Sequence, residues 1–383
     1  MNKTTSYLEL ISGQRRGATA NLLRAMLRTG AIVYRRLLGV RNWYHDHLRL
    51  PDLLPIPVIS VGNITVGGTG KTPMTIWICR RLLERGLKPA VLSRGYKASR
   101  EGLADELLMF SRQCPQAVAI AHPNRTAAGR LAIEKYDVDV AVLDDGFQHR
   151  RLGRDLDIVL IDATRPFGFG YILPRGLLRE SLGGLGRADV IVLTRCDQCD
   201  DQQFDDIERT IRQFNAEAPI LCSMHRAVSF ADLQGNNVQI AENTRVGALA
   251  GIARPDAFEA TLTTMNLAPA GSLWFDDHHV YTPADTETIK RWIQNNNINT
   301  VVTTDKDAVK LDALQANWPV NVIALHIEIE FVGQDDKILI GLIDELLEDY
   351  REYARANDED TDTIDGTGTR VPNKQGMDDD HHV

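Results

Sequence analysis

The residues with the clearest chemical potential form a glycine-rich run, Thr65-Val66-Gly67-Gly68-Thr69-Gly70-Lys71-Thr72. A β-branched segment at 56–61 precedes it and a helix-like segment at 73–85 follows it, which is the context that a phosphate-binding loop requires. Glycines let backbone N–H groups turn inward around phosphate oxygens, and the positive end of the following helix favours the same anion. The run therefore predicts a nucleoside triphosphate site, in which Lys71 reaches the β- and γ-phosphates and the Thr72 hydroxyl binds Mg²⁺. Thr65 stands where the G-x-x-x-x-G-K-[ST] pattern has its first glycine.

A second metal-binding element is expected at the end of another strand. The apolar segment 140–143 leads directly into Asp144 and Asp145, followed by a glycine. Carboxylate oxygens at the carboxyl end of a strand can hold Mg²⁺ directly or through water. The pair therefore completes a predicted metal side to the loop, although either aspartate alone would also fit a turn or a helix N-cap.

Phosphate transfer to a hydroxyl needs a base near the γ-phosphate and cations around the transferred group. Several polar segments offer such groups, and each alone would also fit a surface or core role. They are Asp105 with Glu106 in a loop, Arg125 at the start of a helix, Arg179 with Glu180 after a glycine-rich stretch, and the pair His278 and His279 beside carboxylates. Arg125 is a candidate anion clamp, and Arg179 and Glu180 are expected on the substrate or metal side. Their joint presence favours a kinase.

Two other classes of protein remain open from the residues alone. The segment 194–197, Thr-Arg-Cys-Asp, partly matches the [NT]-K-x-D turn that reads guanine, and Cys196 and Cys199 could take part in a metal site. A GTP-dependent switch or metallochaperone would use both features. A membrane ATPase of the partitioning type also carries a Gly-Gly-x-Gly-Lys-Thr loop. Nucleotide preference and dependence on an acceptor would separate these classes from a kinase.

The elements that must position these residues follow an alternating pattern. Strands are expected at 56–61, 89–93, 138–143, 156–161 and 190–194, and later near 245–250, 299–304 and 320–330, with helix-like segments between them. This alternation predicts an α/β fold, a P-loop NTPase-type, mostly parallel sheet with helices on both faces, followed by a smaller C-terminal α/β domain. We expect a nucleotide-binding domain at 46–235, a second domain at 236–350 and an acidic, disordered tail at 351–383.

Composition sets the outer limits. The chain has 383 residues, of which 43% are hydrophobic and 25% charged, with five scattered cysteines and no apolar run of the ~18 residues that a membrane span needs. It therefore needs no disulfide framework and crosses no bilayer. Residues 1–50 hold nine Lys or Arg against two Asp or Glu, so the head is strongly basic.

The basic head is expected to form an amphipathic helix within 1–45. At 100° per residue its apolar side chains fall within an arc of about 160°, and Arg24, Arg28 and Arg35 flank them. The arc comprises Leu22, Leu23, Met26, Leu27, Val33, Tyr34, Leu37 and Leu38. This pattern is typical of a helix at an anionic membrane surface, and a surface helix packed on its own domain shows it as well. No nucleic-acid partner is expected, because no basic strand is interleaved with aromatic residues.

Several ordered motifs together resemble the tetraacyldisaccharide 4'-kinase family of lipid A biosynthesis. The matches extend in order from about residue 35 to 330. They are S-V-G-N at 60–63 with the loop, S-R-G-Y-K at 93–97, D-D-G-F-Q-H at 144–149, F-G-x-G-x-x-L-P-x-G from 167, L-R-E at 178–180, G-I-A-R-P at 251–255, D-H-H-x-Y at 277–281 and T-T-D-K-D-A at 303–308.

The resemblance implies transfer of the ATP γ-phosphate to the 4'-hydroxyl of tetraacyldisaccharide 1-phosphate, with Mg²⁺, to give lipid IVA. It places the protein on the cytoplasmic face of the bacterial inner membrane as a peripheral protein. It also implies that Asp105 is the catalytic aspartate and that a histidine partner lies at His278 or His279. Asp105 is flanked here by Ala104 and Leu107 around Asp-Glu, where the family has Gly-Asp-Glu-Pro.

Overall fold

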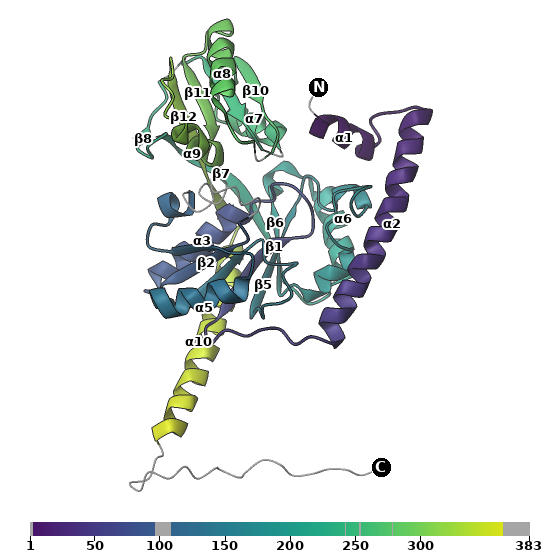
Figure 1. Ribbon diagram of the computed structural model, residues 1–383, viewed down its shortest axis with the longest axis vertical. Helices are drawn as coiled ribbons and strands as arrows, with labels where there is room; N and C mark the ends of the chain where they lie inside the picture. The colour runs from purple at the N-terminus through teal and green to yellow at the C-terminus, as the bar shows by residue number, and fades with distance from the viewer. Residues whose placement is uncertain (1–2, 96–108, 242, 253, 278, 363–383) are drawn as a thin grey trace.

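The structure is a computed structural model that describes residues 3–95, 109–241, 243–252, 254–277 and 279–362. Its strands form one sheet in the order β10-β9-β11-β12-β7-β6-β5-β1-β4-β2-β3, with β8 paired to β7. Figure 1 shows that the sheet has a lower part around β1 and an upper part around β11, joined by β7 and β12. Neighbouring strands are parallel, except that β7 is antiparallel to β12 and β8.

The lower part of the sheet is buried on both faces. Its strands are β1 (Val58–Asn63), β2 (Pro89–Ser93), β3 (Val118–Ala121), β4 (Val140–Asp144), β5 (Leu156–Asp162) and β6 (Val190–Thr194). Every residue of β1, β2, β4, β5 and β6 is buried, which is typical of a parallel sheet covered by helices. Carboxyl ends of parallel strands meet at one edge of a sheet, and the loops that follow β1, β4, β5 and β6 therefore lie together.

Helices cover the two faces of the lower part. On one face, α3 (Lys71–Glu84) and α10 (Asp335–Asp362) pack into a core with β1, β4 and β5. On the other face, α5 (Arg125–Tyr136) packs over β2 and β4, and α6 (Asp201–Arg212) packs over β5 and β6. The predicted α/β, P-loop-type sheet with helices on both faces is confirmed.

The upper part contains β8 (Asn237–Val238), β9 (Val246–Ala250), β10 (Gly271–Trp274) and β11 (Thr300–Thr304). The helices α8 (Pro283–Asn295) and α9 (Asp305–Ala313) cover one face, and α7 (Pro255–Thr264) covers the other. β3 and β10 are not among the expected strands, because each has only four residues and all of them are partly exposed.

The two parts share two long strands, β7 (Ile220–Asp232) and β12 (Asn321–Phe331). β7 pairs with β6 through residues 220–222 and with β12 through residues 223–232, so it begins in the lower part and ends in the upper part. No strand is expected from the sequence at 220–232, because β7 is mostly half-exposed and its side chains do not alternate sharply between apolar and polar.

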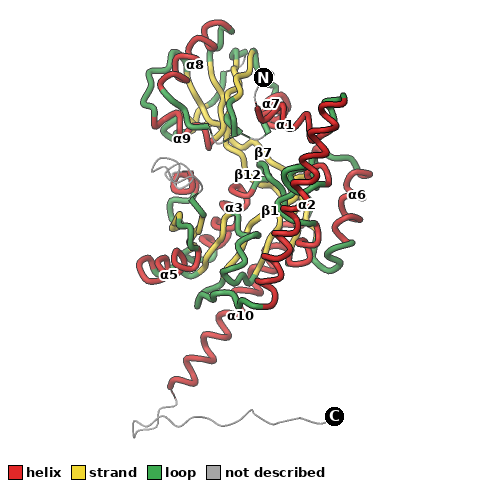
Figure 2. The backbone as a smooth tube through the Cα atoms, turned by 45° about the vertical axis from the view of Figure 1, so that its right-hand side comes forward, coloured by secondary structure: helices red, strands yellow, loops and turns green. Residues whose placement is uncertain are grey.

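The last helix, α10, runs past residue 350, where the second domain is expected to end and the tail to begin. α10 continues to Asp362, eleven residues beyond the expected start of the disordered tail at 351. Its first half packs against the lower part through Leu339, Ile343 and Leu347. By packing, residues 335–347 therefore belong with the nucleotide-binding part and not with the segment 236–350. Figure 2 shows the second half of α10 extending away from the body.

The basic head forms two helices where one is expected, α1 (Lys3–Ser12) and α2 (Ala18–His47). The break falls at Gly13 and Gly17, both at positive φ. One side of α2 packs on the lower part through Tyr34 and Leu38, and α1 is held by Tyr7, whose hydroxyl donates to the Pro174 carbonyl at 2.7 Å. Among the residues that the structure describes, no helix has the length and hydropathy needed to cross a bilayer.

Candidate active site

The glycine-rich run forms a tight loop between β1 and α3. Two of its glycines have a backbone that other residues rarely adopt, Gly67 at φ 130° and Gly70 at φ 87°. A Cβ on Gly70 would lie only 2.5 Å from His225 Nε2 of β7. Gly70 thus allows the loop to pass close to β7 and to enter α3 at Lys71, with the unsatisfied N–H groups of the first helical turn at the loop.

Neighbouring backbone holds the first half of the loop. The Val66 N–H donates to the Leu177 carbonyl at 2.8 Å, and Thr65 forms a β-bridge with Leu178. Thr65 is buried. Both residues were expected to contact the nucleotide, but in this structure the Val66 N–H is already engaged with the segment 177–178. These contacts anchor the start of the loop, and contact of Thr65 and Val66 with the nucleotide stays a prediction.

The centre of the site is a cluster of Lys71, Asp145 and Arg179. Lys71 Nζ lies 3.6 Å from Asp145 Oδ1, and Arg179 Nη1 donates to both oxygens of the same carboxylate at 2.7 and 2.8 Å. Asp145 has φ 56° and directly follows β4, so the chain turns sharply there. Thr72 is half-buried in the first turn of α3, next to Lys71. Four of the predicted residues are therefore placed around the end of β4 and the start of α3.

The charged groups of this cluster change one another's pKa values. Burial raises the pKa of the Asp145 carboxyl, but Lys71 and then Arg179 act in the opposite direction, and the net pKa is below its usual value. Burial lowers the pKa of the Lys71 ammonium, against the opposing effect of Asp145. The cluster favours an ionised aspartate, and its two cations can neutralise phosphate charge.

Asp144 and Arg125 meet behind this cluster. Asp144 is the last residue of β4, and Arg125 is the first residue of α5; both are buried. Arg125 Nη2 donates to the Asp144 main-chain carbonyl at 3.3 Å, and Nη1 donates to the His122 carbonyl at 3.4 Å. The structure therefore brings Arg125 to the acidic strand end, while its role as an anion clamp remains a prediction.

The Glu180 carboxylate is hydrogen-bonded to two neighbouring side chains of the protein. Its carboxylate accepts from Gln148 Nε2 at 2.8 Å and from Arg187 Nη2 at 2.7 Å, and the residue is buried. Gln148 Nε2 also donates to the Asn63 carbonyl at 2.7 Å, and its Oε1 accepts from Arg179 at 3.2 Å. Glu180 contacts Gln148 and Arg187 in this structure, and its place on the substrate or metal side stays a prediction. Gln148 was not singled out, although it lies in the D-D-G-F-Q-H motif three residues after Asp145.

The two remaining catalytic predictions, Asp105 and His278, lie outside the described residues. The neighbouring His279 is described. Its Nε2 lies 3.1 Å from Asp285 Oδ2, and its ring stacks on Phe275 with the centroids 4.6 Å apart. His279 therefore has partners within the upper part of the molecule.

A phosphate-binding loop between a buried strand and a helix, with a carboxylate beside its lysine, defines a nucleotide-binding protein of the P-loop class. A family model described as tetraacyldisaccharide-1-P 4'-kinase matches residues 23–348. The chain belongs to this family, and its function is that of a lipid A 4'-kinase, as the sequence motifs predict.

Individual relatives cover most of the chain. A tetraacyldisaccharide 4'-kinase from Anaeromyxobacter sp. strain K is 35% identical over 323 residues, which is 79% of this chain and 85% of the relative. The corresponding enzyme of Geobacter sulfurreducens is 36% identical over 82% of this chain and 91% of its own length. Among solved structures, the "apo" form of LpxK from Aquifex aeolicus in complex with ATP is similar with a TM-score of 0.66 at 27% identity, covering 85% of this chain and 99% of that chain. Members of this family are kinases. Membership therefore argues against the GTP-dependent switch that the segment 194–197 suggested as an alternative.

Proposed function

We propose that the chain uses the Lys71 cluster to transfer the γ-phosphate of ATP to the 4'-hydroxyl of tetraacyldisaccharide 1-phosphate. The observation that carries this proposal is the meeting of Lys71, Asp145 and Arg179 at the carboxyl ends of β1 and β4. ATP is proposed as the donor because the similar LpxK from Aquifex aeolicus was solved with ATP. The product would be lipid IVA.

The residues present suit Mg²⁺. Hydroxyl and carboxylate oxygens are its preferred protein ligands, and Thr72, Asp144 and Asp145 bring such oxygens to one edge of the sheet. The Asp145 side chain is 39% exposed, so its oxygens are accessible from the loop side. When bound, Mg²⁺ would neutralise charge on the β- and γ-phosphate oxygens. Arg179 holds the Asp145 carboxylate in place through two hydrogen bonds to one Nη1 group.

The residues of the chain would divide the remaining work. Gly67, Gly68, Thr69 and Gly70 would surround the phosphates with backbone N–H groups, and Lys71 would neutralise the transferred group. Asp105, oriented by His278, would accept the proton of the 4'-hydroxyl as its oxygen attacks in line. Arg125 would hold an anionic group from the side of β4.

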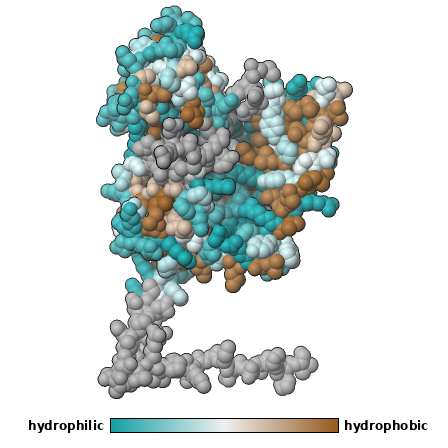
Figure 3. Space-filling view, in the orientation of Figure 1, coloured by the Kyte–Doolittle hydropathy of each residue, from teal (hydrophilic) through white to brown (hydrophobic). Residues whose placement is uncertain are grey.

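The exposed side of α2 would hold the enzyme on an anionic membrane, at the cytoplasmic face of the inner membrane. Apolar residues on this side are exposed to solvent, while Tyr34 and Leu38, at one edge of the apolar arc, pack on the protein. The exposed stripe consists of Leu22, Met26, Val33, Leu37, Val40 and Tyr44. Figure 3 shows brown, hydrophobic side chains over the region of α2. Arg35 and Arg36 are also exposed and would contact anionic headgroups.

The test is transfer of labelled γ-phosphate from ATP to purified tetraacyldisaccharide 1-phosphate with Mg²⁺. Wild type should give a bis-phosphorylated lipid. Lys71→Ala and Asp105→Ala should each lower kcat by about 10²- to 10⁴-fold. Lys290→Ala, a surface lysine of α8 paired with Glu287, is the matched control and should retain full activity. Hydrolysis of ATP without any lipid product from wild type would contradict the proposal, and a fully active Asp105→Ala enzyme would contradict the role of the base alone.

A further inference from the structure

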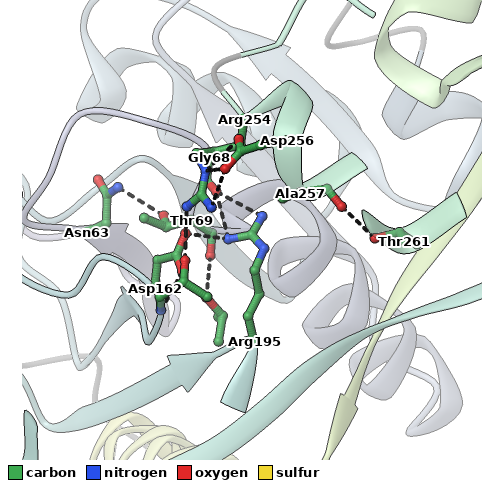
Figure 4. Close-up of polar contacts among 11 residues, drawn as sticks. Asn63, Gly68, Thr69, Asp162, Arg195, Arg254, Asp256, Ala257 and Thr261 are labelled. Atoms are coloured by element: carbon green, nitrogen blue, oxygen red, sulfur yellow. Dashed lines mark hydrogen bonds and ion pairs between the residues drawn. The ribbon is translucent and has the colours of Figure 1, made fainter. Parts of the chain in front are cut away.

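Two arginines from distant parts of the chain share one buried carboxylate next to the phosphate loop. Asp162 ends β5, and its side chain is only 7% exposed. Arg195 Nη1 lies 2.6 Å from Asp162 Oδ2, and Arg254 Nη1 lies 3.1 Å from the same oxygen. Figure 4 shows the three side chains converging beside Gly68 and Thr69 of the loop, with Arg254 on one side and Asp162 and Arg195 on the other. Neither the family motif around Arg254 nor the turn around Arg195 has a role in the mechanism above.

Arg195 reaches from the end of β6 to the backbone of the loop. Its Nη1 and Nη2 both donate to the Gly68 carbonyl, at 3.2 Å each, and the preceding Thr194 Oγ1 donates to the Thr69 carbonyl at 3.2 Å. Arg195 adopts φ 59°, which belongs to the left-handed region and directs the chain back toward the loop. Two successive carbonyls of the loop are therefore held from outside by one turn. The opposite side of the loop is held by Asn63 Nδ2, which donates to Thr69 Oγ1 at 2.9 Å.

These outside contacts matter because the loop has little conformational preference of its own. Glycine is readily accommodated at many backbone angles, so neighbouring contacts must select one conformation. Arg195 fixes the direction of the Gly68 carbonyl. Because a peptide group is planar, the N–H of the same peptide group is then fixed as well. The N–H groups of such a loop are the groups that bind phosphate. The guanidinium is also a buried positive charge close to the site of a polyanion.

Arg254 connects the same carboxylate to the upper part of the molecule. It is the N-cap residue of α7, and its Nη1 also donates to Thr164 Oγ1 at 2.9 Å. Asp256, two residues later, accepts from Arg254 Nε and Nη2 at 3.0 Å each and thereby fixes the guanidinium. The Thr164 hydroxyl in turn donates to Asp162 Oδ1 at 2.6 Å. The phosphate loop, the end of β5 and α7 are thus joined by one continuous set of polar contacts.

We propose that Arg195, Asp162 and Arg254 act as positioning residues for ATP. Arg195 holds the phosphate loop in its binding conformation, Asp162 fixes Arg195, and Arg254 makes this arrangement depend on the placement of the upper part. The inference rests on the proposed function, because ATP is taken as the ligand of the loop. It gives a role to the turn at 194–197 that differs from reading guanine: the buried guanidinium of Arg195 contacts the loop and not a base.

The test compares Arg195→Met and Arg254→Met with Arg226→Met. Arg226 pairs with Glu330 on an exposed face of β7 and β12, so Arg226→Met is a matched control that should bind ATP as wild type does. Arg195→Met should raise the Kd for a fluorescent ATP analogue and the KM for ATP by about tenfold or more, with the KM for the lipid unchanged. Arg254→Met should shift the same two constants by a smaller factor. Arg195→Lys should fall between Arg195→Met and wild type, because an ammonium keeps the charge but cannot span both acceptors.

The pattern of constants separates positioning from general stabilisation. A merely structural role would lower the active fraction, and therefore kcat, with both KM values unchanged; that result would overturn the proposal. The effects of Arg195→Met and Arg254→Met should not add in the double variant, because both residues act through Asp162. If the two effects add fully in the double variant, Asp162 does not couple Arg195 to Arg254, and that part of the proposal is wrong.

Two further measurements keep the test decisive. If Arg195→Met fails to fold, the Kd of Arg195→Lys and the increase in Tm that ATP causes in Arg254→Lys replace it, and wild-type values in both would overturn the proposal. Failure of the proposed function is distinguishable, since wild type itself would then give no phosphorylated lipid, whether or not it binds the ATP analogue. Wild-type binding together with unchanged binding in Arg195→Met contradicts only the positioning role.

Discussion

Lys71 and Asp145 meet across two strands, with Nζ of the lysine 3.6 Å from Oδ1 of the aspartate. They are 74 positions apart in the sequence, yet β1 and β4 are direct neighbours, with Val61 opposite Asp144. Strand pairing thus brings the lysine of the phosphate loop to the acidic end of the neighbouring strand of the sheet. Arg179 arrives from a third segment, which runs alongside the start of the loop through Val66 and Leu177.

Removal of the Asp145 charge should leave the enzyme folded and nearly inactive. Asp145→Asn keeps the shape of the side chain but leaves Lys71 and Arg179 without their shared anion and deprives Mg²⁺ of a ligand. We expect kcat to fall by about 10²- to 10³-fold, measured as lipid phosphorylation at saturating ATP. Asp206→Asn on α6, an exposed acid paired with Arg209, serves as the control and should be fully active. An Asp145→Asn enzyme within twofold of wild type would remove this residue from the site.

The loop should not tolerate a side chain at Gly70. Its φ of 87° is unfavourable for alanine by roughly 1 kcal/mol, and a Cβ would lie 2.5 Å from His225 Nε2. Gly70→Ala should therefore weaken ATP binding by at least about tenfold and lower the Tm. Gly341→Ala in α10 is the control, because no atom lies within 4 Å of its Cβ position. There we expect an unchanged Kd and an equal or higher Tm.

The double variant Gly70→Ala with His225→Ala separates the two causes. Space for the Cβ returns in this variant while the backbone strain remains, so that binding should recover in part. Complete recovery would show that the backbone angle is unimportant, and no recovery would show that the contact with His225 is unimportant.

The sequence indicates the short-range parts of this molecule well. The phosphate loop, the buried strands and the aspartates after β4 are local patterns, since each depends on a run of fewer than ten residues. The contacts that complete the site are different in kind. Gln148, which reaches Asn63 and Glu180, and Arg195, which reaches Gly68, act over long separations that no local pattern encodes. The family resemblance includes the motif that contains Gln148, and Arg195 lies in the segment 194–197 that partly matches a guanine-reading turn, but neither pattern shows which atoms these side chains contact.

The long strands β7 and β12 run across the expected domain boundary. A boundary near 235 assumes that the chain leaves one sheet before entering the next, whereas β7 takes part in both. The chain then returns through β12, and α10 packs back on the lower part. Hydrophobic periodicity shows that α10 has an apolar face, but it does not show which sheet that face covers.

Buried histidines should make the protein less stable in mild acid. Burial, followed by the effect of Arg195, lowers the pKa of His225 to about 3, whereas in the unfolded chain a histidine titrates near pH 6.5. Below about pH 6.5 the unfolded state therefore binds a proton that the folded state does not, and stability falls as the pH falls. His149 acts in the same direction, since burial and then Arg125 lower its pKa to about 4.

The change from pH 7 to pH 5 in the midpoint of urea unfolding measures this effect. His225→Gln should show a smaller loss over that interval than wild type, because glutamine does not titrate. Asp157 works in the opposite direction, since burial raises its carboxyl pKa to about 6. Asp157 is present in both wild type and His225→Gln, so the difference between their losses of stability reports on His225 alone. Equal losses in both proteins would contradict the assignment. His47→Gln, a change at an exposed residue of α2, controls for the loss of a histidine as such.

Membrane binding should depend on the exposed stripe of α2 and not on the integrity of the fold. Leu22 and Leu37 lie on this stripe and point away from the protein, so Leu22→Glu and Leu37→Glu should leave the Tm nearly unchanged. Each introduces a negative charge where apolar contact with acyl chains and attraction to anionic headgroups are expected. Co-sedimentation with vesicles containing anionic lipid should fall several-fold in each variant and further in the pair. Thr288→Glu on the exposed side of α8 should sediment as wild type does.

Deletion of residues 1–40 is a weaker test, because it also removes Tyr34 and Leu38 from the core. If Leu22→Glu with Leu37→Glu binds vesicles and phosphorylates vesicle-embedded lipid as wild type does, α2 is a packed surface helix and the membrane attachment lies elsewhere.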